Sequence, residues 1–154
     1  MRKLWQKLKA FAAPDEPEHL RRGRLGERAA KAFLQQQGMK FLTANFRSSR
    51  GEIDLIFRAG STAGEAYAGN ATDCLVFVEV KTRSSEAWRR PAAAVNARKR
   101  RLISQTAMDY LRQLRDPRVK LRFDIVEVLL ADGAVREVRH LPNAFPLSAP
   151  YRHG

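Results

Sequence analysis

Cysteine is almost absent from the sequence: the 154 residues contain only Cys74, so an internal disulfide bond is excluded. Disulfides persist mainly in oxidising compartments, and a chain without one is typical of the cytoplasm. Cys74 stands at the start of an apolar run and has no neighbouring His or Lys to activate a thiolate. We interpret it as a small hydrophobic residue. We therefore expect a cytoplasmic protein.

Long apolar runs are also missing. No stretch approaches the roughly 18 apolar residues of a membrane-spanning helix. The start, MRKLWQKLKAF, superficially suggests a secretion signal, but polar residues interrupt its apolar part. Residues 1–12 are basic and amphipathic, which is compatible with a loosely packed terminal helix or with a segment that contacts phosphate or a membrane surface. We describe 1–20 as a basic N-terminal arm and expect no membrane partner.

Several kinds of reactive site have no counterpart in the sequence. The three histidines, His19, His140 and His153, are scattered and lack the spacing of zinc ligands. The chain contains no nucleophile elbow, no P-loop and no dinucleotide-binding fingerprint. It also contains no Cys/His nucleophile pair. These absences argue against zinc enzymes, serine hydrolases, P-loop NTPases and dehydrogenases.

Acidic residues are few compared with basic ones. The chain has 29 Lys and Arg against 16 Asp and Glu, a formal net charge of +13. Such a charge attracts polyanions, so nucleic acid is the first partner to consider and an anionic membrane the second. The alternative is a basic, solvated surface without a partner.

Hydrophobic periodicity predicts a single α/β domain over 21–140, followed by a Pro-rich tail over 141–154. The expected order is helix, two strands, a loop rich in small residues, one strand, helix and two strands. This order gives a mixed sheet flanked by helices. The expected helices span 22–37 and 91–114, the expected strands span 40–47, 51–58, 75–81, 121–130 and 134–139, and the loop spans 59–73.

Two charged residues interrupt the apolar run LVFVEVKTR at 75–83. Glu79 and Lys81 are two positions apart, so they emerge on one face of the strand. Asp54 is likewise a carboxylate in the middle of the strand GEIDLIFR. Burying a charge is costly unless it is paired or coordinated. Cross-strand ion pairing is the simpler explanation, but two carboxylates on successive strands also suit a hard divalent cation.

Two helical residues have side chains that are placed to reach such a site. Glu27 falls at the margin of the apolar face of the first helix, although a first-turn glutamate also complements the helix dipole. Lys99 projects with the apolar stripe of the second helix. It either snorkels to solvent or reaches an anionic site. Asp54 and Glu79 would be metal ligands, Glu27 an auxiliary ligand or base, and Lys81 a group that stabilises negative charge.

At these residues the sequence resembles the YraN-like bacterial proteins, which are related to PD-(D/E)XK nucleases, including archaeal Holliday-junction resolvases. The matching segments are GRLGERAAKAFLQQQGMKFLTANFR, GEIDLI, VFVEVKTR, VNARKRRLISQTAMDYL and RFDIVEV. The resemblance implies a restriction-endonuclease-like core, dependence on Mg²⁺ or Mn²⁺, and structured or branched DNA as substrate. It places Glu27, Asp54, Glu79 and Lys81 at the motif positions. Asp124 is also typical, and we expect a structural hydrogen bond from it. The loop over 59–73 is longer than the family pattern.

The sequence therefore predicts a Mg²⁺-dependent endonuclease acting on DNA by metal-assisted phosphodiester hydrolysis. The alternative is a non-catalytic nucleic-acid-binding module on the same scaffold. Cutting of a junction would favour a homodimer, although no interface stripe stands out. The residues expected to hold the nucleic-acid backbone are Arg83, Arg89, Arg90, Arg98, Lys99, Arg101 and Arg112.

Overall fold

The computed structural model describes residues 16–60, 74–84 and 95–150. The arm before residue 16, most of the expected loop, and Arg89 and Arg90 lie outside these ranges. The helices and strands follow one another in the order α2 (Glu18–Gln36), β1 (Lys40–Ser48), β2 (Gly51–Ala59), β3 (Cys74–Ser84), α3 (Ala97–Gln113), β4 (Lys120–Ala131) and β5 (Ala134–Phe145).

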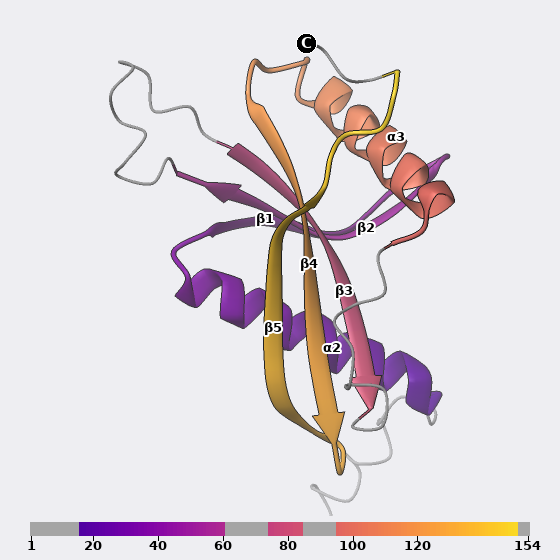
Figure 1. Ribbon diagram of the computed structural model, residues 1–154, viewed down its shortest axis with the longest axis vertical. Coiled ribbons are helices and arrows are strands. Elements are labelled where there is room, and N and C mark those ends of the chain that lie inside the picture. The colour runs from indigo at the N-terminus through magenta and orange to yellow at the C-terminus, as the bar shows by residue number, and fades with distance from the viewer. Residues whose placement is uncertain (1–15, 61–73, 85–94, 151–154) are drawn as a thin grey trace, which may run out of the picture.

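The five strands form one sheet in the order β1-β2-β3-β4-β5 (Figure 1). Only β3 and β4 run parallel, and the other neighbours pair antiparallel. A parallel pair requires a crossover connection, and α3 lies in the chain between these two strands. Helices α2 and α3 lie on opposite sides of the sheet. The predicted fold class is confirmed, and the arrangement is consistent with a restriction-endonuclease-like core.

Each face of the sheet has its own hydrophobic core because side chains alternate along a strand. On the α3 face, the rings of Phe77, Phe123 and Phe145 stack with centroids 5.6 and 5.1 Å apart. On the α2 face, Val76 and Val78 pack in a cluster with residues of that helix. β3 is therefore buried on both sides where it reads LVFV, as its continuous apolar run predicts.

α3 begins later than the sequence suggested. The expected start at Pro91 is wrong, because the helix begins at Ala97 and Asn96 is its N-cap. The Asn96 side chain accepts a hydrogen bond from the backbone N–H of Lys99 at 2.9 Å. This satisfies one of the donors left free at a helix start. The cap fixes which residues occupy the first turn.

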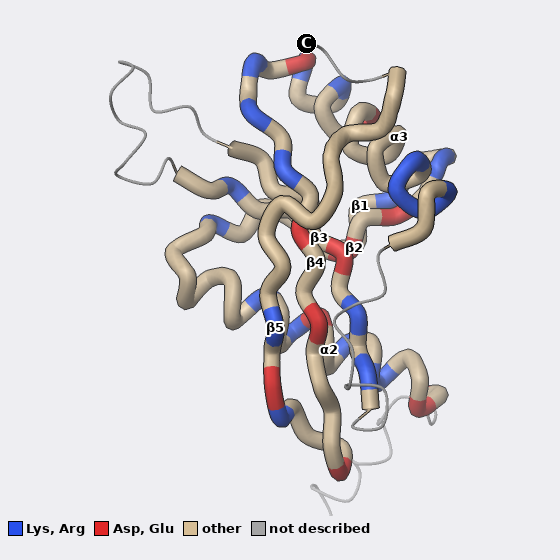
Figure 2. Tube along the Cα trace, viewed as in Figure 1, with Lys and Arg blue, Asp and Glu red and all other residues tan. Residues whose placement is uncertain are grey.

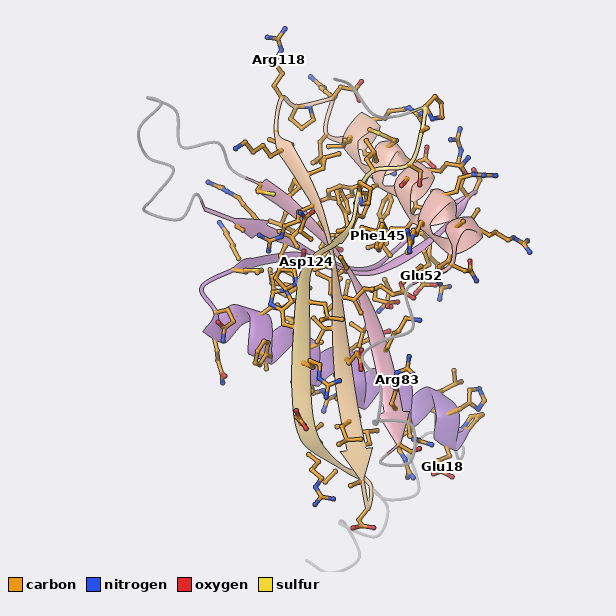
Figure 3. The ribbon with its side chains drawn as sticks, in the orientation of Figure 1. Glu18, Glu52, Arg83, Arg118, Asp124 and Phe145 are labelled. Atoms are coloured by element: carbon orange, nitrogen blue, oxygen red, sulfur yellow. The ribbon has the colours of Figure 1, made fainter. Side chains whose placement is uncertain are left out.

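β5 continues past the expected end at 139 and runs to Phe145, so residues 141–145 belong to the sheet rather than to a tail. Proline is tolerated at Pro142 because β5 is an edge strand. The register with β4 shifts there, and Asn143 has a positive φ of 50°. Its backbone N–H donates to Asp124 Oδ1 at 2.9 Å. Figure 3 shows Asp124 and Phe145 near the middle of the sheet.

Asp124 is the polar centre of this bulge. Its fully buried carboxylate also accepts hydrogen bonds from Arg122 at 2.8 and 2.9 Å and contacts His140 Nε2 at 2.7 Å. Burial raises the pKa of Asp124, but the hydrogen bonds from His140 and Arg122 outweigh this and hold the pKa below its usual value. Asp124 thus has the structural role that the sequence suggested.

Candidate functional site

The candidate site lies where β2 and β3 separate. Pairing between the two strands ends at Leu55 and Val78, after which β2 continues with β1 and β3 continues with β4. The next residues on the two strands are Asp54 and Glu79. We call this place the fork, defined by Asp54, Glu79 and Val80. It brings together the two carboxylates that the sequence proposed as metal ligands.

The two carboxylates are close enough to interact, since repulsion from Glu79 raises the pKa of Asp54. Glu79 is two residues from Phe77, which belongs to the core on the α3 face, so the Glu79 side chain points to that face. On β2 the alternation of side chains is broken at Asp54, because Ile53 packs in the core on the α3 face and Leu55 in the core on the α2 face. Asp54 is therefore a neighbour of Glu79 at the place where β2 changes the direction of its side chains.

Asp54 is held in the fork by a backbone donor. Its Oδ2 atom accepts a hydrogen bond from the N–H of Val80 at 2.7 Å. This N–H lies beyond the last residue of β3 that pairs with β2, so a side chain takes the place of a strand partner. Burial raises the pKa of Asp54 to about 7, and repulsion from Glu79 and Glu27 adds to the effect. Negative charge at the fork is therefore poorly balanced.

Glu79 has its cationic partner on α3. Lys99 Nζ lies 3.3 Å from Glu79 Oε1, and the Glu79 side chain is 13% exposed. The cap at Asn96 positions Lys99 in the first turn of the helix, over the fork. Lys99 also lowers the pKa of Asp54, so its charge acts on both carboxylates. Of the two sequence-based explanations for Lys99, the structure supports the one in which it reaches an anionic site.

Glu27 approaches the fork from α2. Burial raises its pKa, a hydrogen bond with Asn45 lowers it, and repulsion from Glu52 and Glu79 raises it further. Gly26 explains how the helix comes so close. A Cβ atom at Gly26 would lie 1.9 Å from Thr82 Oγ1 of β3, so only glycine fits there. The sequence LGER therefore sets the approach of Glu27.

Lys81 lies on the same face as Glu79, two residues further along β3. It is half-buried, and it forms no ion pair with another residue in the described part of the chain. Its neighbour in register on β4 is Glu127. Lys81 is thus an amine beside the fork that the carboxylates there do not neutralise.

Glu127 is a site residue that the sequence analysis missed. Its side chain is fully buried, and within the described residues neither of its oxygens has a hydrogen-bond partner. Arg83 Nε and Arg139 Nη1 lie 3.9 and 3.8 Å from Oε2. A glutamate inside the apolar run IVEVLL was the signal that could have revealed it. Glu127 and the two arginines form a charged cluster next to Lys81.

Comparison with known proteins identifies the family. A family model described as "Uncharacterised protein family UPF0102" matches residues 26–128. The chain belongs to UPF0102. UPF0102 proteins of Trichlorobacter lovleyi and Porphyromonas gingivalis are 40% and 42% identical to it, over 82% and 84% of this chain and 91% and 87% of theirs. One from Pelobacter propionicus is 39% identical, over 86% of this chain and 87% of its own. The YraN-like resemblance is confirmed.

The basic residues expected to contact nucleic acid fall into separate places in the UPF0102 fold. Arg98, Lys99 and Arg101 lie at the beginning of α3, close to the fork, whereas Arg83 lies on β3 beside Glu127. Arg112 lies about 20 Å along α3 from Arg98, by the rise of 1.5 Å per residue, and pairs with Asp109. Figure 2 shows acidic positions near the middle of β2 and β3, with basic positions on both sides of them.

The donor set at the fork suits Mg²⁺ or Mn²⁺ in part. Mg²⁺ is commonly held by one or two carboxylates, with waters and substrate phosphates completing its shell. Asp54 and Glu79 supply two carboxylates that repel each other, and a cation would relieve that repulsion. Within residues 16–60, 74–84 and 95–150, no three His, Cys, Asp or Glu side chains are grouped closely enough to form a complete metal site. Glu27 stands near as an auxiliary carboxylate.

Among the described residues, no helix is both long and apolar enough to cross a bilayer.

Proposed function

We propose that this protein is a Mg²⁺-dependent endonuclease that acts on DNA, including branched DNA. The observation that carries the proposal is the position of Asp54 and Glu79, adjacent to each other at the fork, with the pKa of Asp54 raised to about 7 by burial and by Glu79. Two half-buried acids that repel each other are poorly explained by stability alone. They are well explained as ligands of a cation.

Each residue at the fork would have a different role in phosphodiester hydrolysis. A divalent cation held by Asp54 and Glu79 would polarise the phosphodiester and lower the pKa of a bound water. Lys81 would stabilise negative charge that develops on the phosphate. Glu27 would act as an auxiliary ligand or as a base toward the attacking water.

Arginines around the fork would hold the DNA backbone. Arg98 and Arg101 are exposed on the first turn and a half of α3, next to Lys99. Arg83 lies two residues beyond Lys81 on the same face of β3, and its guanidinium group lies near Glu127. Contacts with phosphates release counterions, so we expect affinity for DNA to fall steeply with salt. The formal charge of +13 supports such a partner.

A second candidate is a non-catalytic nucleic-acid-binding module. The observation that favours it is the contact between Lys99 and Glu79, because a lysine already balances one of the acids. In that case the fork would be a structural ion cluster on a scaffold that retains its basic surface.

Cleavage assays separate the two candidates. The purified protein would be offered duplex, single-stranded and four-way-junction DNA with Mg²⁺ or Mn²⁺. Metal-dependent cleavage that Glu79→Gln abolishes while binding is retained supports the nuclease. Glu137→Gln, which neutralises an exposed acid on β5, is the matched control and should cleave normally. Tight binding without metal-dependent cleavage of any of these DNAs would favour the module.

A further inference from the structure

A cavity lies away from the fork, at the C-terminal end of β3. It has a volume of about 680 Å³ and is formed by the first half of α2, the end of β3 at Ser84, and the turn between β4 and β5. Its size is within the range of about 300–1,000 Å³ that is usual for small-molecule sites. We call it the arginine cavity, after the residues of α2 that line it.

Four arginines of α2 line the arginine cavity: Arg21, Arg22, Arg24 and Arg28. Arg24 pairs with Glu16, but Arg21, Arg22 and Arg28 have no ion pair or hydrogen bond with another described residue. Arg24 is three residues after Arg21 and four before Arg28, and like charges at these spacings destabilise a helix. The arginines gathered along the cavity therefore carry a cost that an anionic ligand would relieve.

Part of the cavity lining is apolar. Leu25 of α2 and Leu130 and Ala131 at the end of β4 contribute to it, and Leu130 is buried. Two acids, Glu18 and Asp132, also line the cavity, so its walls carry more positive than negative charge. Guanidinium groups bind phosphate in a bidentate manner and also stack on flat rings. A cavity lined by both arginines and apolar side chains matches a nucleotide, which has a phosphate and a flat base.

The arginine cavity is connected to the fork through two elements. Ser84 is five residues beyond Glu79 on β3, roughly 16 Å at the rise of a strand. On α2, Arg28 directly follows Glu27, which faces the fork. Figure 3 shows Arg83 on this half of β3 and Glu18 at the start of α2. The cavity and the fork are therefore joined by β3 and α2.

We infer that the arginine cavity binds a phosphate-bearing nucleotide unit, separately from the carboxylates of the fork. The inference rests on the proposed function in that the unit belongs to the nucleic acid acted on at the fork. Arg21, Arg22 and Arg28 hold the phosphate, and the apolar wall at Leu25 and Leu130 receives the base. The cavity thereby anchors the strand a few nucleotides from the place of reaction.

The test uses the full-length Arg21→Gln/Arg28→Gln protein. Its matched control is Arg115→Gln/Arg118→Gln, which removes the same two charges; Figure 3 shows Arg118 at the opposite end of the molecule. Binding of a labelled single-stranded oligonucleotide is measured without divalent metal, as a function of salt. Equal thermal unfolding of the two variants shows that both are folded. Adenosine monophosphate, added as a competitor, tests whether a free nucleotide occupies the same cavity.

We expect the cavity variant to bind the oligonucleotide about tenfold more weakly than the control variant, with a salt slope lower by about 1.5. If adenosine monophosphate displaces the oligonucleotide from the wild type but not from the cavity variant, the arginine cavity also binds a free nucleotide. Equal affinity and salt slope for the two variants overturn the inference. If Glu79→Gln abolishes cleavage while Arg21→Gln/Arg28→Gln still weakens oligonucleotide binding in that background, the arginine cavity acts separately from the fork.

Discussion

Lys99 Nζ of α3 lies 3.3 Å from Glu79 Oε1 of β3. The ammonium group stands at the fork, where the proposed cation would also be held, and it offsets part of the negative charge of Glu79 and Asp54. The contact links α3 to the fork. It also means that a divalent cation competes with a charge that the protein itself supplies.

Lys99→Gln should therefore bind Mn²⁺ more tightly than the wild type. An ion pair with a half-exposed lysine contributes up to about 1 kcal/mol, which corresponds to about a fivefold change in affinity. Isothermal titration with Mn²⁺ measures the difference. Arg98→Gln, which removes the adjacent exposed charge, should leave the affinity close to that of the wild type. Weaker Mn²⁺ binding in Lys99→Gln would show that the lysine does not compete for the site.

Asp54 should make the stability of the protein depend on pH. Its pKa is raised from 3.8 to about 7, so the folded state holds the proton longer than the unfolded state does. The stabilising contribution of the neutral carboxyl is complete below about pH 4 and is lost as pH rises to about 7. Without divalent metal, wild-type stability relative to Asp54→Asn should fall by about 2–4 kcal/mol over this window.

Urea unfolding of both proteins at several pH values provides that comparison. The asparagine retains a carbonyl oxygen to accept the hydrogen bond from Val80, so the variant should stay folded. Parallel curves for wild type and Asp54→Asn between pH 4 and 8 would contradict the raised pKa.

Gly26 should be intolerant of any side chain. In Gly26→Ala the new Cβ would lie 1.9 Å from Thr82 Oγ1, and α2 would have to move away from β3. Overpacking of this kind costs about 1–3 kcal/mol. Gly23→Ala is the control on the same helix, because nothing lies within 4 Å of its Cβ. It should gain about 0.5–1 kcal/mol.

Chemical denaturation of the two glycine variants gives these free energies directly. Thr82→Ala should restore much of the loss when combined with Gly26→Ala, since it removes the colliding oxygen. Equal stabilities of Gly23→Ala and Gly26→Ala would show that α2 does not depend on close packing at Gly26.

Asp124→Asn should destabilise the sheet without touching the fork. The fully buried carboxylate binds Arg122, His140 and the backbone of Asn143, and the substitution leaves the half-buried Arg122 without its charge partner. Breaking a buried pair costs about 3 kcal/mol. Thermal unfolding should show the loss, whereas Mn²⁺ affinity at temperatures where the variant is folded should be unchanged. If Asp124→Asn is as stable as the wild type, Asp124 does not stabilise the β5 bulge.

The sequence predicted the strands well where the pattern is local. The run LVFV identified β3 as a central strand because both of its faces are apolar, and Asp132-Gly133 identified the β4–β5 turn, where both residues have positive φ. The expected start of α3 at Pro91 was wrong because the helix is capped by Asn96, which was not considered as a cap. The expected end of β5 at 139 was wrong because residues from 141 were assigned to a Pro-rich tail, although an edge strand tolerates Pro142.

Pattern alone suggested that Asp54 and Glu79 are close together, but not why. Their closeness depends on the register of β2 with β3 and on the separation of the strands after Leu55 and Val78, which are tertiary properties. The buried state of Glu127 likewise depends on neighbours far away in the chain. Charged residues inside apolar runs marked each of these positions, but only the fold shows which partner each one meets.

Titration with Mn²⁺ is the most direct test that Asp54 and Glu79 hold one cation together. Wild type and Glu137→Gln should bind one Mn²⁺ with the same affinity, and Asp54→Asn and Glu79→Gln should each bind it at least about tenfold more weakly, a loss of about 1.4 kcal/mol. Equal Mn²⁺ affinity in all four proteins, or no binding by the wild type, would contradict the account.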